Sequence, residues 1–316
     1  MSQEFPDIHS VTDLSRLPIP VSKRGWPWTL DEVTPLTQPP LNIWPRITVV
    51  TPSFKQGQFI EETIRSVLLQ CYPNLEFIIM DGGSTDNTVE IIKKYEPWIT
   101  YWVSEKDRGQ CHAINKGFER ATGEIFAWLC SDDVYAPGAL CKVAEVIRNQ
   151  KLAMAIGDAI ITNGPDSLEG KLDRRRPTFP EMAYNVKTLA QPSVFWTKDL
   201  WQAAGPLKED IYFSMDYDLW LRMIPSAKSV AYIDSVLSYQ RTQPQQKTNT
   251  NHPLMHKFFQ QRVEVAYQAA RARGESGFGW LARVWWFRLR QSRGRFWRLK
   301  EPGFHWQALH NMFHRS

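Results

Sequence analysis

The sequence predicts an α/β fold with a mostly parallel central sheet and helices on both faces. From residue 46 to residue 150, short apolar runs rich in β-branched residues alternate with segments in which apolar residues recur at helical spacing. Strands that alternate with helices in this way favour parallel pairing, with the helices packed on the two faces of the sheet. The chain has 316 residues, 43% of them hydrophobic, so it can bury a sizeable core.

The expected elements follow a regular order up to residue 150. We expect strands at 47–53, 75–81, 99–105 and 124–133, and helices at 57–70, 88–95, 109–121 and 138–150. Beyond residue 150 the alternation loosens. Residues 152–162 and 229–235 are expected to be strands, and residues 210–224 to begin extended and become helical.

These patterns divide the chain into three parts. Residues 1–45 are rich in Pro and Trp without a sustained period, and they predict an N-terminal extension packed on the domain. Residues 46–250 form the domain itself, with halves at 46–150 and 151–250. Residues 251–316 predict a helical C-terminal extension, which is aromatic and basic and holds twelve Lys/Arg against three Asp/Glu.

The cysteines and the apolar segments of the sequence indicate the cellular compartment. The four cysteines show no zinc-ligand spacing, and a chain of this size does not need disulfides for stability. No stretch approaches the roughly 20 apolar residues of a membrane span, and the first residues lack a signal-peptide pattern. We therefore expect a cytoplasmic protein.

Polar clusters follow four of the expected strands. In a parallel sheet ligands bind outside the carboxyl ends of the strands, so these clusters are expected to face one crevice. The clusters are Thr51-Pro52-Ser53, Asp81-Gly82-Gly83-Ser84, Ser104-Glu105 and Ser131-Asp132-Asp133.

The carboxylate pair Asp132 and Asp133 is a candidate metal site, because it follows an apolar strand and offers hard oxygen ligands to Mg²⁺ or Mn²⁺. The alternative is a turn or helix cap, which Asp also favours. Asp81 lies in a glycine-rich segment, DGGSTDNT, that suits close approach of a ligand but is equally typical of a strand-to-helix turn. Neither a GxGxxG after the first strand nor a P-loop motif is present.

Five motifs together resemble family 2 glycosyltransferases. The segments at 48–88, 104–118 and 128–140 are similar to the nucleotide-binding half of that family, and QPSVFW with MDYDLWLRM resembles the acceptor half of bacterial enzymes that build polysaccharides. The likeness covers about residues 46–248. It implies a GT-A fold, the nucleotide-diphospho-sugar transferase type.

The resemblance implies roles for matching residues. Asp81 would accept a hydrogen bond from the base, Arg108 would lie near the nucleotide, and Asp132 would be the main metal ligand beside Asp133. The implied donor-binding set is Thr51, Pro52, Ser53, Asp81, Gly82, Arg108, Ser131 and Asp132. Asp216 resembles the general base that deprotonates the acceptor hydroxyl, and Asp218 is the second candidate.

Three residues depart from the family pattern. Cys130 replaces a usual Asp or Asn and is a poor ligand for a hard cation. His112 stands where many relatives carry Asp. Gln243 occupies the place of a metal-binding His, so either metal affinity is weaker or the loop acts through Arg241 and Lys247 on the diphosphate.

The resemblance implies transfer of a monosaccharide from a nucleoside-diphosphate sugar, with UDP expected, to a hydroxyl of a glycan or lipid-linked acceptor. A base and a metal pair without a second carboxylate placed as nucleophile favour inversion. Two alternatives stay open: a sugar-1-phosphate nucleotidyltransferase, and a catalytically weak sugar-binding scaffold. Trp196 and Trp220 flank the expected acceptor region, either as faces for sugar rings or as core residues.

The tail at 280–300 mixes tryptophans with arginines, which suits the headgroup layer of an anionic membrane. The alternative is a helix packed on the domain with solvated arginines. Nucleic acid is not expected, since no recognised binding module accompanies the tail. A peripheral position on the inner face of the cell membrane follows from the first interpretation.

Overall fold

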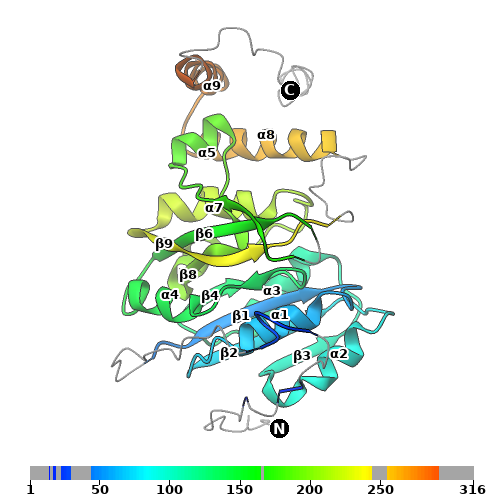
Figure 1. Ribbon diagram of the computed structural model, residues 1–316. Coiled ribbons are helices and arrows are strands. Elements are labelled where there is room, and N and C mark those ends of the chain that lie inside the picture. Colours follow the sequence, from blue (N-terminus) through cyan, green and yellow to red (C-terminus); the bar gives the residue numbers. More distant parts are fainter. Residues whose placement is uncertain are drawn as a thin grey trace, which may run out of the picture.

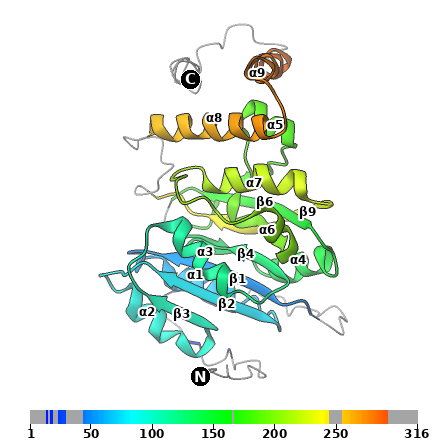
Figure 2. The ribbon, with the colours of Figure 1, turned by 180° about the vertical axis from the view of Figure 1, so that it is seen from behind.

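The computed structural model describes residues 14, 17–18, 23–29, 44–164, 167–243 and 255–291, with side chains up to residue 287 in the last helix. One mixed sheet crosses the molecule and helices cover both faces (Figures 1 and 2). The strand order is β3-β2-β1-β4-β8-β6-β9-β5, with β7 beside β6. The expected GT-A-type α/β fold is confirmed.

The first half of the sheet is parallel and matches the sequence prediction closely. β1 (Ile47–Ser53) pairs in parallel with both β2 (Leu75–Asp81) and β4 (Ile125–Trp128), and β3 (Tyr101–Ser104) extends the sheet beside β2. All seven residues of β1 are buried, as expected for a parallel strand covered on two faces. The helices of this half are α1 (Ile60–Leu68), α2 (Thr88–Lys94), α3 (Gln110–Arg120) and α4 (Ala139–Ile147).

Alternate residues of β1 face two separate cores. Ile47 and Val49 pack with α1, while Val50 packs with α3 on the opposite face. Gly117 of α3 lies so close to β1 that a Cβ there would be 2.5 Å from a methyl of Val50. The regular apolar spacing of this half therefore positions the strand ends rigidly.

The second half is more mixed than the sequence predicts. β8 (Val194–Thr197) runs antiparallel to β4 and to β6 (Ala153–Thr162), and β6 pairs in parallel with β9 (Ser229–Gln240). The short strands β5 (Val134–Tyr135) and β7 (Gly170–Asp173) pair antiparallel with β9 and β6. Five elements here were not expected, because each is too short for periodicity to reveal: β5, β7, β8, α5 (Phe179–Asn185) and α6 (Lys198–Ala204).

A tryptophan cluster joins the two halves. Trp128, Trp196 and Trp220 are each 0% exposed, and the rings of Trp128 and Trp220 stack with centroids 5.5 Å apart. Trp196 and Trp220 are therefore core residues, and their interpretation as faces for sugar rings is wrong.

The described parts of the N-terminal extension lie against the domain. The indole N–H of Trp26 donates to the backbone carbonyl of Tyr135, at 2.7 Å. The buried guanidinium of Arg65 in α1 donates to the carbonyls of Pro27 and Trp28, at 3.0 and 3.2 Å. These contacts attach the extension to α1 and to the region of β5.

The C-terminal helices form the last layers of the molecule. α8 (Met255–Ala272) lies over α7 (Met215–Ser226), and α9 (Gly277–Gln291) lies beyond it (Figure 1). Trp280 of α9 is buried, and its indole N–H donates to the carbonyl of Ala183 in α5 at 3.0 Å. None of the helices in the described ranges has the length and apolar character needed to cross a membrane.

Candidate active site

Three strand ends meet at one level of the sheet. Ser53 of β1 is in register with Asp81 of β2, which is in register with Ser104 of β3. The carbonyl of Ser53 also accepts a hydrogen bond from the Gly82 N–H at 2.8 Å. The sequence prediction that polar clusters share one edge of the sheet is thereby confirmed for these three strands.

The Asp81 carboxylate is held by its own loop. It is 2% exposed and accepts from the N–H groups of Gly83 (3.1 Å) and Ser84 (2.9 Å) and from the hydroxyls of Ser84 (2.5 Å) and Ser104 (2.6 Å). A nucleotide base would have to share this carboxylate with those donors. Asp81 therefore orders the glycine-rich turn that the sequence singled out.

Beside Asp81, two hydroxyl groups are buried without a partner. The Thr51 Oγ1 and Ser53 Oγ atoms have no hydrogen-bond partner in the described structure, and both residues are at most 5% exposed. Pro52, between them, is also buried. At Gly82 a Cβ atom would lie 2.7 Å from a carboxylate oxygen of Asp107, so a larger residue would require the Asp107 side chain to move. Buried hydroxyls without partners at a strand end are suited to a polar ligand.

Arg108 lies on the surface between the two halves. Its guanidinium makes a bidentate ion pair with Glu209 of the second half, at 2.8 and 2.9 Å. Its backbone N–H points at Nδ1 of His112, 3.4 Å away, so His112 orders the loop. The Arg108 side chain is 68% exposed and is accessible to an anionic ligand that displaces Glu209.

The candidate metal ligands lie after β4. Cys130, Asp132 and Asp133 each offer one ligand atom within 4.8 Å of the others. An Asp133 oxygen accepts from the backbone N–H of Arg241 at 2.8 Å, and Asp132 Oδ2 accepts from Gln243 Nε2 at 2.5 Å. Ser131, between the candidate ligands, is buried. The two carboxylates are therefore arranged side by side, with Asp133 the deeper one.

Burial raises the pKa of both carboxyl groups. For Asp133 the neighbouring charge of Asp132 adds to the effect of burial and raises its pKa well above the ordinary value, while the charge of Arg241 opposes it. For Asp132, burial raises the pKa against the hydrogen bond from Gln243 and the charge of Arg241. A divalent cation would neutralise this pair, so the residues present fit a hard metal ion.

Arg241 has a different position from the one the sequence suggested. It is 3% exposed, and its guanidinium donates to the carbonyl of Asp132 (2.7 Å) and to the carboxylate of Glu62 in α1 (2.6 Å). It therefore holds the loop that carries Asp132 against α1, and its guanidinium is engaged there. Lys247, the other residue of that hypothesis, lies outside the described residues.

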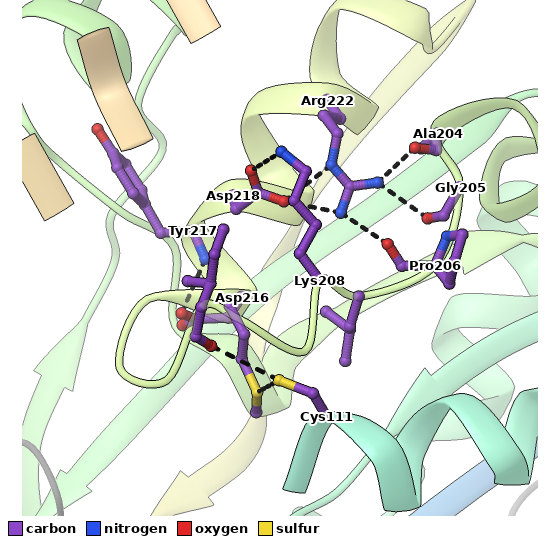
Figure 3. Close-up of polar contacts among 12 residues, drawn as sticks. Cys111, Ala204, Gly205, Pro206, Lys208, Asp216, Tyr217, Asp218 and Arg222 are labelled. Carbon is purple, nitrogen blue, oxygen red and sulfur yellow. Dashed lines mark hydrogen bonds and ion pairs between the residues drawn. The ribbon is translucent and has the colours of Figure 1, made fainter. Parts of the chain in front are cut away.

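The two carboxylates predicted for the acceptor half, Asp216 and Asp218, occupy different environments (Figure 3). Asp218 is 6% exposed and its two oxygens accept from Lys208 (2.9 Å) and Arg222 (2.9 Å). Asp216 is half-buried at the start of α7 and accepts from the backbone N–H of Tyr217 at 2.8 Å. Burial raises the pKa of Asp216, and the charges of Arg262 and Arg175 oppose that effect.

Arg262 is a site residue that sequence reasoning missed. It lies on α8, 46 positions after Asp216, in a segment assigned to the C-terminal extension. No motif surrounds it. Two signals in the sequence could have indicated it: Arg262 lies four residues after Phe258, and both lie on an amphipathic helix. Together they predict that Arg262 is on the helix face that contacts the domain.

A series of contacts links Cys130, near Asp132, to the start of α7, where Asp216 lies. The Gln110 side chain lies 3.3 Å from Sγ of Cys130, and its neighbour Cys111 lies 3.0 Å from Sδ of Met215. Met215 directly precedes Asp216. The N-terminus of α3 therefore stands between the end of β4 and the start of α7, and the structure brings the predicted donor and acceptor residues to the two sides of one helix end.

The fold is of the GT-A type, and the chain resembles known glycosyltransferases. Residues 48–198 match the family model of glycosyl transferase family 2. It is 29% identical over 220 residues to an uncharacterized glycosyltransferase of Rickettsia typhi, covering 65% of this chain and 67% of the relative.

Two further matches describe the wider likeness. A teichuronic acid biosynthesis glycosyltransferase of Bacillus subtilis, TuaG by name, is 38% identical over 114 residues, which is 35% of this chain and 45% of the relative. The crystal structure of S. aureus TarS 1-349 in complex with UDP-GlcNAc is similar at a TM-score of 0.55 with 17% sequence identity, covering 78% of this chain and 72% of that one. At this identity the second likeness shows the fold alone.

Proposed function

We propose that this protein is an inverting glycosyltransferase that moves a monosaccharide from a UDP-sugar to a hydroxyl of a glycan or glycolipid in polysaccharide biosynthesis. The observation that carries the proposal is the pairing of two carboxylate groups across the N-terminus of α3. One group, after β4, is suited to a diphosphate-bound cation, and the other, at the start of α7, is suited to a base. The name of TuaG supports a role in polysaccharide biosynthesis, and the UDP-GlcNAc complex of TarS supports UDP as the donor nucleotide.

On the donor side, Asp132 would hold a Mg²⁺ or Mn²⁺ ion, with Asp133 behind it. When bound, the ion would neutralise charge on the leaving diphosphate. Gln243 is adjacent to Asp132, and its amide offers one further hard oxygen. Cys130 is a soft ligand whose Sγ is close to the Gln110 and Gln191 side chains, so we assign it no direct bond to the ion. Thr51, Pro52, Ser53, Asp81, Gly82, Arg108 and Ser131 would surround the nucleotide.

On the acceptor side, Asp216 would be the base. Both oxygens of Asp218 are engaged by Lys208 and Arg222, and that Arg also donates to the carbonyls of Gly205 (3.0 Å) and Pro206 (2.9 Å). If Asp218 took a proton from an acceptor, it would lose these ion pairs with Lys208 and Arg222. Among the residues described, Asp216 is therefore the single available carboxylate at the acceptor position, and none is left to act as a nucleophile. This supports direct attack of the acceptor hydroxyl on the sugar, which inverts the anomeric centre.

The exposed tryptophans of α9 support a peripheral membrane contact. Trp280 and Val284 are buried, so this part of the helix packs on the domain, whereas the neighbouring residues Trp285 and Trp286 are 44% and 51% exposed. Indole rings at that exposure suit a headgroup layer. We propose that this face contacts an anionic membrane that presents a lipid-linked acceptor. Residues 292–300 of the tail lie outside the described residues.

The test is release of UDP from a set of UDP-sugars by the purified protein, with and without Mn²⁺. Binding of a donor is measured in parallel as a rise in unfolding temperature, since a ligand that binds only the folded state stabilises it. The proposal expects both signals, each dependent on the cation. Binding without UDP release would favour the scaffold alternative, and release of pyrophosphate from a nucleoside triphosphate with a sugar 1-phosphate would favour the nucleotidyltransferase.

A further inference from the structure

The start of α7 is capped by a residue of α8. The first residue of α7 is Met215, and its N-cap Ser214 makes no side-chain capping hydrogen bond. Instead the Gln261 side-chain oxygen accepts from the N–H of Phe213 (2.7 Å) and from that of Ser214 (3.3 Å). Unpaired N–H groups at a helix start need such acceptors. The position of Asp216 therefore depends on the C-terminal helix.

The next residue of α8, Arg262, lies over the neighbour of Asp216. Its guanidinium carbon is 5.0 Å from the ring centroid of Tyr217 and 5.5 Å from that of Phe258. Its Nε atom is buried and has no hydrogen-bond partner in the described structure. The Arg262 guanidinium therefore lies near two aromatic rings and places its positive charge beside the residue that follows Asp216.

The charged groups that face Asp216 come from two other elements. Arg262 comes from α8 and Arg175 from the segment between β7 and α5, while Tyr217 follows Asp216 on α7. The guanidinium of Arg175 is engaged bidentately by Asp173, with Nε 2.7 and 2.9 Å from its two oxygens. Arg262 makes no ion pair within the described part of the chain. Its charge is thus the less compensated of the two.

We propose that α8 is part of the catalytic site and that Arg262 is a positioning residue, which places a positive charge beside Asp216 at the start of α7. The inference rests on the proposed role of Asp216 as base. It assigns to the C-terminal extension a function in the acceptor half. Without Arg262, the burial of Asp216 would be opposed by the N–H of Tyr217 and by Arg175, whose charge is partly compensated by Asp173.

The experiment is a pH titration of the Asp216 carboxyl carbon by NMR in the whole protein, labelled with ¹³C at the aspartate side-chain carboxyl and assigned with Asp216→Asn. In Arg262→Gln we expect the proton affinity of Asp216 to rise about tenfold, the effect of losing one nearby opposite charge. Arg262→Lys keeps the charge, so its titration is expected to stay close to that of wild type. Arg271→Gln, an exposed arginine of the same helix, is the matched control and should not shift the titration.

An unchanged Asp216 titration in Arg262→Gln would overturn the proposal. If that variant does not fold, the wild-type protein is titrated instead, and the NMR resonance of Arg262 Nε is followed as a function of pH. This resonance is assigned by its absence in Arg262→Lys. The proposal requires it to shift with the same midpoint pH as the Asp216 carboxyl. Different midpoints would also overturn it. The measurement needs no turnover, so a wrong assignment of the base is seen separately, as full activity in Asp216→Asn.

Discussion

The nucleotide-sugar half and the acceptor half hold their carboxylates in different ways. Asp81 accepts hydrogen bonds from donors within 23 positions of it, all in the parallel part of the sheet. Asp216 has one backbone donor beside it, and its other influences come from Arg175 and from Arg262, 46 positions away. The first half is assembled locally, whereas the second depends on contacts between distant segments.

The same contrast appears between two residues of one motif. Asp216 and Asp218 are two positions apart on a helix, which turns about 100° per residue, so they face different sides. One side carries Lys208 and Arg222 and serves the fold, while the other faces α8. Identical side chains thus meet different neighbours, which is the basis for a structural role of Asp218 and for the proposed role of Asp216 as base. The following predictions test this division.

The largest effect is expected in the nucleotide-sugar half. Asp132→Ala should lower UDP release about 10³-fold or more, because loss of a cation that stabilises the leaving diphosphate costs several kcal/mol in the transition state. Its unfolding temperature without metal should not fall, because burial raises the pKa of this carboxyl and its charge is therefore costly. Asp199→Ala, on α6, is the control. An active Asp132→Ala protein would rule out the metal assignment.

In the acceptor half, Asp216→Asn should lower turnover by about 10² to 10⁴, the usual contribution of a general base. UDP binding, followed by thermal shift, should be retained because the residue acts on the acceptor side. Loss of UDP binding in this variant would place Asp216 in the donor pocket instead. If Asp218→Asn were the more damaging change for turnover, the base would be Asp218.

Asp218→Asn should act on stability. Removing this buried charge weakens two ion pairs, and we expect the free energy of unfolding in urea to fall by about 2 kcal/mol, the usual value for hydrogen bonds to charged groups. The matched control, Lys208→Met, removes only the partner that is half exposed and should cost less. Unchanged stability in Asp218→Asn would contradict the structural role.

The pH dependence of turnover should report Asp216. A base acts only when unprotonated, and burial raises its pKa, so activity should fall as pH decreases through that raised value. The acid limb of the profile is therefore expected above the ordinary value of 3.8. Residual turnover of Asp216→Asn should lack this limb. A wild-type limb at or below 3.8 would show that another group titrates.

The smallest effect concerns α9. Replacing Trp285 and Trp286 together by Ser should reduce co-sedimentation with vesicles of anionic lipid about fivefold, equivalent to roughly 1 kcal/mol. A truncation before this helix would be a poor test, because it would remove the buried Trp280. Leu172→Ser, another exposed apolar residue, is the control. Equal binding by the double variant and the wild type would exclude this face as the membrane contact.

The sequence by itself determined the parallel half and the position of its polar edge. Apolar periodicity fixes β1 to β4 and the helices between them, and Ser131, Asp132 and Asp133, which follow β4, then lie beyond the carboxyl edge of the sheet. The motifs at Asp81 and Asp216 were also visible, because the chemistry they suggest depends on residue type and order along the chain.

Only the tertiary structure decided how those side chains are used. It gave Asp216 and Asp218 different neighbours, buried Trp196 and Trp220 in the core, and bound Arg241 to the loop that carries Asp132. It also brought Gln261 and Arg262 to the start of α7. The physical reason is that burial and charge compensation depend on which distant residues meet, and local spacing carries no information about partners that lie tens of positions away.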